Sequence, residues 1–299
     1  MKLRLGLIGK SAGNGHPYSW AAICNGYSPK DMKDCGYASI PKYLAMQKWP
    51  HSQLKNATIT HLWTQDHKLS RKIADATHIG EIVNHPTEMI GNIDALLLAR
   101  DDANNHFGFA KPFLEIGLPI YIDKPIATNL DDYYKLISLQ RYSGQIFSCS
   151  ALRFSPEMKL SKSMLKKLGP IRLIQGLTPK YWETYAVHLI DPLLLILGLD
   201  SSPKKLYSTA LNGKGRTLGF RTNNNGPNVQ LTAAGADISA PISLRIIGEY
   251  DEITLTFENS FLAFRNTLER FISIAMKKEE ILPERFNLEV VRLIEMGLI

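Results

Sequence analysis

The sequence predicts an N-terminal α/β domain with a parallel, doubly wound sheet, followed by an α+β domain with a mainly antiparallel sheet. Up to residue 125, short apolar strands alternate with helical patterns, and each strand is too apolar to have a face in water. After residue 171, strands of alternating apolar and polar residues follow one another, as in an antiparallel sheet with one covered face. We therefore expect one domain over residues 1–125 and a second over residues 126–299.

The elements of the first domain follow from this alternation. Strands are predicted at residues 3–8, 57–63, 93–99 and 120–122, and helices at residues 18–25, 68–77 and 105–116. Residues 28–56 form a long insertion between the first helix and the second strand. Two interpretations of this insertion stay open, a contact between subunits and a cover over an active site.

The second domain is expected to open with helices and to continue with strands. Helices are predicted at residues 131–142, 156–168, 183–197 and 260–277, and strands at residues 171–178, 205–211, 228–234, 242–248 and 252–258. Residues 212–228 are expected to be an exposed hairpin region. A closing helix is predicted over residues 283–297, and packing back onto the first domain is one arrangement open to it.

Composition excludes several classes of function. Lys and Arg (35) exceed Asp and Glu (28) by 7, but the basic residues are scattered, which indicates a solvated surface and no nucleic-acid partner. No apolar run approaches ~18 residues, so we expect a cytoplasmic protein with no membrane partner. Cys24, Cys35 and Cys149 show no CxxC spacing, so neither a disulfide framework nor a metal site is expected.

A glycine-rich turn lies between the first strand and the first helix, in the segment GLIGKSAGNGHPYSW. Glycines at this place let the backbone approach a pyrophosphate, whose charge is met by N–H groups at the start of the helix. The spacing from Gly9 is G-x-x-x-G-x-G instead of GxGxxG, and a purely structural turn is the alternative. The candidate cofactor contacts are Gly9, Ser11, Gly13, Asn14, Gly15 and His16.

The end of the second strand decides how a cofactor ribose would be held. A carboxylate at this tip bonds the ribose hydroxyls and repels a 2′-phosphate. Here Thr64 stands where that acid is commonest, and Asp66 follows two residues later. We therefore expect either NAD or NADP as cofactor, with both residues as candidate contacts.

The strand at residues 120–122 ends abruptly in Asp123, Lys124 and Pro125. In an open parallel sheet, ligands bind at the carboxyl ends of the strands. Lys124 is therefore a candidate active-site cation and cofactor contact, with a solvated lysine at a strand end as the alternative.

Several segments together resemble one family. GLPIYIDKPIATN resembles the Glu-Lys-Pro signature of the Gfo/Idh/MocA family, the glucose-fructose oxidoreductase and inositol dehydrogenase group, with Asp123 in place of the more frequent Glu. Other segments are similar to the family in the same order, namely DALLLARDDANNHFGFAKPFLEIG, RFSPEMKLSKSMLKKLGPIRLIQG, YAVHLIDPLLLILG and LPERFNLEVVRLIEMG. The resemblance spans nearly the whole chain.

The resemblance implies a Rossmann domain followed by a domain with an open-faced antiparallel sheet. It also implies NAD(P)-dependent hydride transfer at a carbon of a sugar, polyol or nucleotide-linked sugar. Lys124 would contact the reacting oxygen, its bond to Pro125 is often cis in relatives, and His188 would act as general acid and base. Family members usually associate through the open sheet face, which implies a homodimer or homotetramer formed through the C-terminal sheet.

Departures from the family pattern leave some roles open. Many relatives have an aspartate where Thr184 stands, so Tyr185 is a candidate to supply a phenol to the acid–base chemistry. Arg100 either holds a phosphate or a substrate carboxylate, or pairs with a neighbouring aspartate. The candidate substrate contacts are Arg153, Tyr181, Trp182, Thr184 and His188, and some of the aromatic residues among the candidates are core residues in the alternative interpretation.

Two other functions remain as alternatives to a sugar oxidoreductase. One is a regulatory protein that senses NAD(P) without catalysis, and the other is a reductase of a non-sugar carbonyl. The presence of both Lys124 and His188 favours an enzyme, because a sensor has no need of a proton donor.

Overall fold

The computed structural model describes residues 2–198, 203–222, 226–236, 238–280 and 282–299. These residues form two compact units, each made from three stretches of chain. The first unit comprises residues 1–126, 134–148 and 260–282, and the second comprises residues 127–133, 149–259 and 283–299. The sequence places a single boundary at residue 125, whereas the chain passes between the units more than once.

The first unit is built on a six-stranded parallel sheet in the order β3-β2-β1-β4-β5-β6. Its strands are β1 (Leu3–Ile8), β2 (Ala57–Trp63), β3 (Glu81–Ile82), β4 (Ala95–Leu98), β5 (Ile120–Ile122) and β6 (Ile146–Phe147). Its helices are α1 (His16–Asn25), α2 (Pro29–Met32), α3 (Ser39–Ala45), α4 (His67–Thr77), α5 (His106–Glu115) and α10 (Ser260–Ala275). The predicted parallel, doubly wound sheet is confirmed.

The helices of the first unit begin where the sequence offers a cap or a proline. Pro17 occupies the first turn of α1, where its missing N–H costs nothing. The carboxylate of Asp66 accepts the N–H of Lys68 and so caps the start of α4. Helix α4 ends at Thr77 and is followed by the capping residue His78, which adopts a left-handed conformation with φ of 55°.

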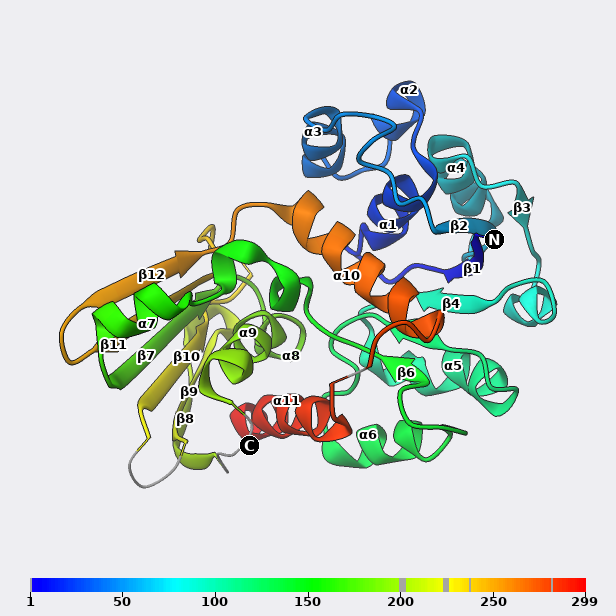
Figure 1. The fold of residues 1–299 in the computed structure, drawn as a ribbon. Coiled ribbons are helices and arrows are strands. Elements are labelled where there is room, and N and C mark those ends of the chain that lie inside the picture. The colour runs from blue at the N-terminus through cyan, green and yellow to red at the C-terminus, as the bar shows by residue number, and fades with distance from the viewer. Residues whose placement is uncertain (1, 199–202, 223–225, 237, 281) are drawn as a thin grey trace. The chain divides into compact units, whose positions relative to one another are not determined.

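An aromatic cluster in the first unit joins segments that lie far apart in the chain. The ring of Tyr121 on β5 stacks on Trp20 of α1, with 4.5 Å between centroids, and meets Phe147 of β6 edge-on at 5.0 Å. Phe271 of α10 lies 5.7 Å from Tyr121. Figure 1 shows α10 running beside α1. The helix expected at residues 260–277 is therefore part of the core of the first unit.

The second unit is built on a six-stranded mixed sheet in the order β12-β11-β7-β10-β9-β8. Its strands are β7 (Ile171–Thr178), β8 (Lys204–Ala210), β9 (Arg216–Arg221), β10 (Asn228–Ala233), β11 (Ser243–Gly248) and β12 (Glu252–Thr256). Its helices are α7 (Lys162–Leu168), α8 (Trp182–Tyr185), α9 (Val187–Leu197) and α11 (Glu284–Leu298). All neighbouring pairs are antiparallel except β7 with β10, so the mainly antiparallel sheet is confirmed.

One face of this second sheet is covered and the other is open. Ile174, Leu231 and Leu244 are fully buried on the covered face, next to α8, α9 and α11. The closing helix α11 belongs to the second unit.

One helix connects the two units, and several short 3-10 helices lie within them. Helix α6 (Leu130–Ile137) contains one of the points at which the chain passes between the units. Short 3-10 helices lie at Pro86–Met89, Ala103–Asn105, Ala151–Phe154, Pro156–Met158 and Asn212–Lys214.

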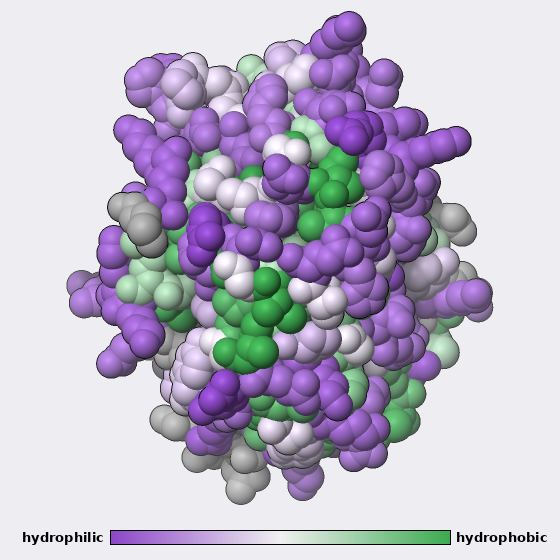
Figure 2. Space-filling view, turned by 90° about the vertical axis from the view of Figure 1, so that its right-hand side faces the viewer, coloured by the Kyte–Doolittle hydropathy of each residue, from purple (hydrophilic) through white to green (hydrophobic). Residues whose placement is uncertain are grey.

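The expectation of an exposed hairpin over residues 212–228 is wrong for its central part. Residues 216–221 form β9, in which Leu218 and Phe220 are fully buried, and residues 223–225 lie outside the described part of the chain. Among the described residues, no helix is long and apolar enough to cross a membrane. On the face seen in Figure 2, hydrophilic residues predominate and hydrophobic ones gather in small, separate patches.

Candidate active site

The glycine-rich turn of the first unit presents free backbone donors. Strand β1 leads into Gly9, whose N–H donates to the carbonyl of Trp63 at 2.9 Å, and α1 begins at His16. Gly13 has φ of +76°, and a Cβ there would meet open space. The amides of Ala12, Gly13 and Gly15 have no acceptor among the described residues. A set of free N–H groups just before a helix is suited to bind a phosphate oxygen.

Two side chains from neighbouring strand ends hold this turn in place. The amide of Gln65 accepts the N–H of Lys10 at 3.2 Å and donates to its carbonyl at 2.8 Å. The guanidinium of Arg100 also donates to that carbonyl at 3.3 Å, and it binds Asp102 through Nε and Nη2 at 3.0 and 2.5 Å. Of the two roles left open for Arg100, the structure contains the pairing with an aspartate. The sequence did not single out Gln65.

The insertion contributes a tyrosine to the same turn. The hydroxyl of Tyr37 donates to the carbonyl of Asn14 at 2.9 Å and accepts from Nζ of Lys10 at 2.7 Å. A Cβ on Gly15 would lie 2.8 Å from Cδ1 of Ile40 and 3.0 Å from the Tyr37 ring, so a larger residue here would displace these side chains. The insertion over residues 28–56 therefore packs directly against the glycine-rich turn.

Asp123 joins the end of β5 to the start of α1. Its carboxylate is 1% exposed, and it accepts from Nδ2 of Asn14 at 2.9 Å and from Nδ1 of His16 at 2.5 Å. It also accepts the N–H of Lys124 at 2.8 Å. Burial alone would raise the pKa of Asp123, but the charges of His16 and Lys124 and the hydrogen bonds hold that pKa well below its usual range. The side chains of Asn14 and His16 are thus used within the protein.

Lys124 lies at the same edge of the sheet and is nearly fully buried. Its Nζ lies 3.4 Å from Oδ2 of Asp101, whose other oxygen accepts from the hydroxyl of Ser11. The N–H of Asp101 donates back to Oγ of Ser11 at 3.1 Å. The peptide bond between Lys124 and Pro125 is cis. The structure thus brings together Ser11 and Lys124, which the sequence predicts, with Asp101, which it does not.

The tip of β2 differs from what a ribose-binding acid requires. The hydroxyl of Thr64 donates to the carbonyl of Asp66 at 2.7 Å and lies 2.9 Å from Oγ of Ser70, so it serves the local turn. The carboxylate of Asp66 lies at the surface, where it caps α4. The preference between NAD and NADP stays open at this tip.

An apolar hollow lies beside the end of β2. Its volume is about 420 Å³. Trp63 and Phe109 contribute aromatic faces to it, with ring centroids 5.5 Å apart, and the guanidinium of Arg100 lies over Phe109 at 4.8 Å. The residues that line it are Trp63, His85, Pro86, Thr87, Asn104, Asn105, Gly108, Phe109, Pro112 and Phe113. The sequence did not predict this hollow, because its walls come from three separate segments.

In the second unit, His188 on α9 contacts polar side chains from two other segments. Its Nδ1 lies 2.8 Å from Oγ of Ser150, and its ring meets that of Tyr185 edge-on with 5.0 Å between centroids. The hydroxyl of Tyr185 accepts from Nζ of Lys180 at 2.6 Å. The structure therefore brings His188 and Tyr185, two of the candidate catalytic residues, into contact.

A buried ion pair contacts this network through Ser150. Nε of Arg153 donates to Oδ1 of Asp191 at 2.6 Å, and the guanidinium lies over the ring of Phe286 at 4.3 Å. The other oxygen of Asp191 accepts the N–H of Ser150 at 2.5 Å. Burial raises the pKa of Asp191, against the opposing charge of Arg153. Ser150 thus links this ion pair to His188, a role that no sequence motif indicated.

The remaining candidate substrate contacts differ in how far their side chains are exposed. Tyr181 is 39% exposed and Thr184 is half-buried. Trp182 is 1% exposed, and its indole N–H donates to the carbonyl of Ile294 at 2.8 Å. Trp182 is therefore a core residue of the second unit, which corrects its placement among the substrate contacts. Among the described residues, no group of three or more His, Cys, Asp or Glu side chains has a geometry that could hold a metal ion.

Comparison with known proteins identifies the fold. Residues 35–150 match the model of the Gfo/Idh/MocA family, described as an oxidoreductase family with an NAD-binding Rossmann fold. No match was found among curated protein sequences. The match to the family begins after the glycine-rich turn, whose spacing departs from GxGxxG.

Solved structures extend the likeness to the whole chain. Myo-inositol 2-dehydrogenase from Lactobacillus plantarum is 12% identical, with 100% of this chain and 96% of that chain covered and a TM-score of 0.75. Myo-inositol dehydrogenase from Lactobacillus casei, in complex with NAD(H) and myo-inositol, is 15% identical, with coverages of 99% and 93% and a TM-score of 0.72. UDP-N-acetylglucosamine 3-dehydrogenase from Acidithiobacillus ferrooxidans is 13% identical, with coverages of 99% and 97% and a TM-score of 0.72. At these identities the likeness shows the fold. The matched segment, residues 35–150, covers less than half of the chain and is similar to the NAD-binding Rossmann fold of the Gfo/Idh/MocA oxidoreductase family.

Proposed function

We propose that the chain is an NAD- or NADP-dependent oxidoreductase that transfers a hydride between nicotinamide and a carbon of a sugar, a polyol or a nucleotide-linked sugar. The observation that carries the proposal is the carboxyl edge of the first sheet, where Lys124 ends β5 close to the glycine-rich turn. The similar L. casei structure binds NAD(H) and myo-inositol, which supports the same substrate class here.

The first unit offers a donor set that fits a dinucleotide. The free amides of Ala12, Gly13 and Gly15 would hold the pyrophosphate, since these N–H groups have no acceptor among the described residues. The hollow that Trp63 and Phe109 help to line has room for the adenine ring against one of these aromatic faces. Residues Gly9, Ser11, Asn14 and His16 shape the turn around these donors.

The residues of the chain would divide the chemistry between them, while the bound nicotinamide supplies or accepts the hydride. The ammonium of Lys124 would stabilise negative charge on the reacting oxygen. His188 would give or take the proton, with Ser150 fixing the orientation of its ring at Nδ1. Tyr185, Tyr181 and Thr184 would contact the hydroxyl groups of the substrate. Arg153 would act through Asp191, because its Nε binds that carboxylate.

The proposal is tested by titrating the protein with NADH and NADPH while energy transfer from tryptophan to the nicotinamide is followed. We expect saturable binding of at least one cofactor, and reduction of NAD or NADP by a member of a panel of inositols, sugars and nucleotide-linked sugars. Absence of saturable binding of either cofactor up to millimolar concentration would contradict the proposal. Tight binding without turnover on any sugar or carbonyl substrate would favour the sensor alternative.

A further inference from the structure

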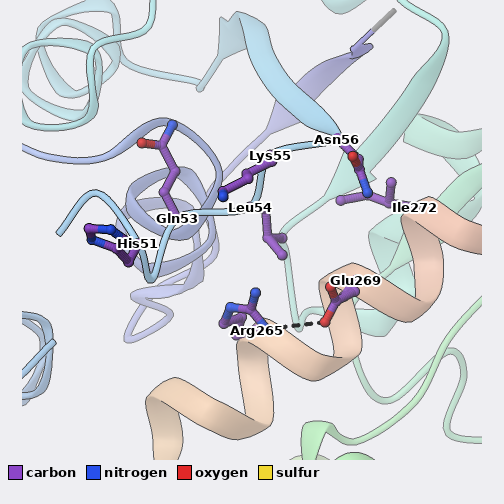
Figure 3. A pocket seen from close by; sticks show the side chains of 8 residues that line it. All are labelled: His51, Gln53, Leu54, Lys55, Asn56, Arg265, Glu269 and Ile272. Carbon is purple, nitrogen blue, oxygen red and sulfur yellow. Dashed lines mark hydrogen bonds and ion pairs between the residues drawn. The ribbon is translucent and has the colours of Figure 1, made fainter. Parts of the chain in front are cut away.

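A second cavity of the first unit lies at the opposite end of β2 from Trp63. Its volume is about 330 Å³. Figure 3 shows that one wall comes from the segment just before β2 and the other from α10. The residues that line it are His51, Gln53, Leu54, Lys55, Asn56, Arg265, Glu269 and Ile272. Because β2 begins at Ala57, this cavity is at the amino edge of the sheet, whereas the glycine-rich turn is at the carboxyl edge.

The lining of this cavity is rich in hydrogen-bond donors and basic side chains. His51 and Lys55 come from the segment before β2, and Arg265 comes from α10. Asn56 adds a side-chain amide, whereas Nε2 of Gln53 donates to the carbonyl of Cys24 at 2.9 Å. Glu269 is the one carboxylate in the lining. Two permanent positive charges and a histidine therefore face one negative charge.

Arg265 is fixed by the protein on one side. Its Nε donates to the carbonyl of Ser52 at 3.2 Å, which ties α10 to the segment before β2, and its Nη1 donates to Glu269 at 3.1 Å. The Glu269 side chain is 50% exposed, and an i,i+4 ion pair of this kind contributes little. A bound anion can therefore take the place of Glu269 on a guanidinium that is already oriented.

We propose that this cavity binds a phosphate group, either as free phosphate or as the phosphate of a small monoester. The fork of donors on Arg265 matches phosphate oxygens, and Lys55 adds a point charge from the facing wall. A doubly charged oxyanion satisfies this excess of positive charge better than a single carboxylate does. The cavity volume lies at the lower end of the range for small-ligand sites, which leaves room for a group of sugar size.

The test titrates the full chain with inorganic phosphate, glucose 6-phosphate and glucose, by calorimetry and by amide NMR. We expect saturable binding of at least one phosphate ligand with amide shifts at residues 51–56 and in α10, and no shifts at these residues with glucose. Arg265→Gln should weaken binding about tenfold or more, because a charge-assisted hydrogen bond is lost. Glu269→Gln should tighten binding, because the competing carboxylate is removed. Lys48→Gln, an exposed lysine outside the lining, is the matched control and should bind as the wild type does.

Stronger binding of glucose 6-phosphate than of phosphate would assign the monoester, and equal binding would assign the free ion. The proposal is overturned if no phosphate ligand saturates, if Arg265→Gln and Glu269→Gln both bind as the wild type does, or if the shifts lie only outside residues 51–56 and α10. Should Arg265→Gln fail to fold, Lys55→Gln and the wild-type amide shifts carry the same test. Neither cofactor nor turnover enters the measurement, so its outcome is independent of the proposed oxidoreductase activity.

Discussion

Asp123 shows how a single buried carboxylate organises the ligand edge of the first unit. Because its pKa is lower in the folded chain than in the unfolded one, the unfolded chain binds more protons at acidic pH. The stability that Asp123 contributes is therefore present above the ordinary aspartate pKa of about 4 and is lost as the pH falls below it.

We predict that Asp123→Asn lowers the free energy of unfolding at neutral pH and makes it less dependent on pH between about 5 and 2. Urea unfolding followed at a series of pH values measures both effects. Asp75→Asn, which changes an exposed carboxylate of α4, is the control and should keep the wild-type slope. An unchanged acid dependence in Asp123→Asn would show that this carboxylate is not coupled to folding.

Lys124 and His188 are the residues on which the proposed chemistry depends. We predict that Lys124→Ala and His188→Ala each lower kcat by about 10² or more on the substrate found in the panel. The affinity for the cofactor should survive His188→Ala, because the glycine-rich turn belongs to the first unit and His188 to the second. Lys111→Ala, at an exposed lysine of α5, serves as control. Near wild-type turnover in either variant would refute the assigned role.

The sequence singles out candidate site residues that stand at recognisable positions and misses neighbours that only the folded chain brings into contact with them. Lys124 was proposed because it ends a buried strand, and the glycine-rich turn was proposed because it follows the first strand. Asp101 and Ser150 were not, because their partners lie 90 and 38 residues away in the chain. Such pairings arise only when strand ends or helices meet in the folded chain.

At the scale of elements, the buried pair of Arg153 and Asp191 fastens the 3-10 helix Ala151–Phe154 to α9. We predict that Asp191→Ala lowers the free energy of unfolding by about 3–5 kcal/mol, because it leaves the guanidinium buried without its counter-ion. The matched control is Glu249→Ala, which removes the partner of the exposed Arg172 and should cost about 0–1 kcal/mol. Urea unfolding of the three proteins gives the comparison. Equal losses in the two variants would contradict this account.

The bounds of a strand could be predicted where the residues of the strand itself form a clear apolar or β-branched run. Residues 3–8, 57–63 and 120–122 form strands with the predicted bounds, because each is a continuous apolar or β-branched run. Strand β9 was missed because Gly219 interrupts a short pattern between two arginines. Its place is set by neighbours, since the ring of Tyr207 on β8 covers this glycine. The two-residue strands β3 and β6 are too short to leave a pattern.

At the scale of the whole molecule, the open face of the second sheet is the surface that we expect to pair with another copy of the chain. Leu177 on β7 is 37% exposed and Tyr207 on β8 is 44% exposed. The strand register puts both on the face opposite the buried Ile174 and Leu231. Apolar side chains left exposed on one sheet face offer a second copy of the chain a surface to bury.

We predict that light scattering at tens of micromolar protein gives the mass of a dimer or a tetramer. Leu177→Lys should shift this mass towards the monomer, because it puts a charge on the open face. Leu195→Lys, at an exposed leucine of α9, is the control and should leave the mass unchanged. A wild-type chain that is monomeric under these conditions would refute the prediction.

The aromatic cluster has a consequence for the order in which the chain folds during synthesis. Trp20 and Tyr121 leave the ribosome early, but Phe271 follows only after every strand of the second sheet has been made. The first unit, although it begins the chain, therefore cannot complete its core until after the second sheet has been synthesised. A shortened chain that ends at residue 125 would leave Trp20 and Tyr121 without β6 and α10. Any fragment meant to bind the cofactor alone has to carry residues 260–282 as well.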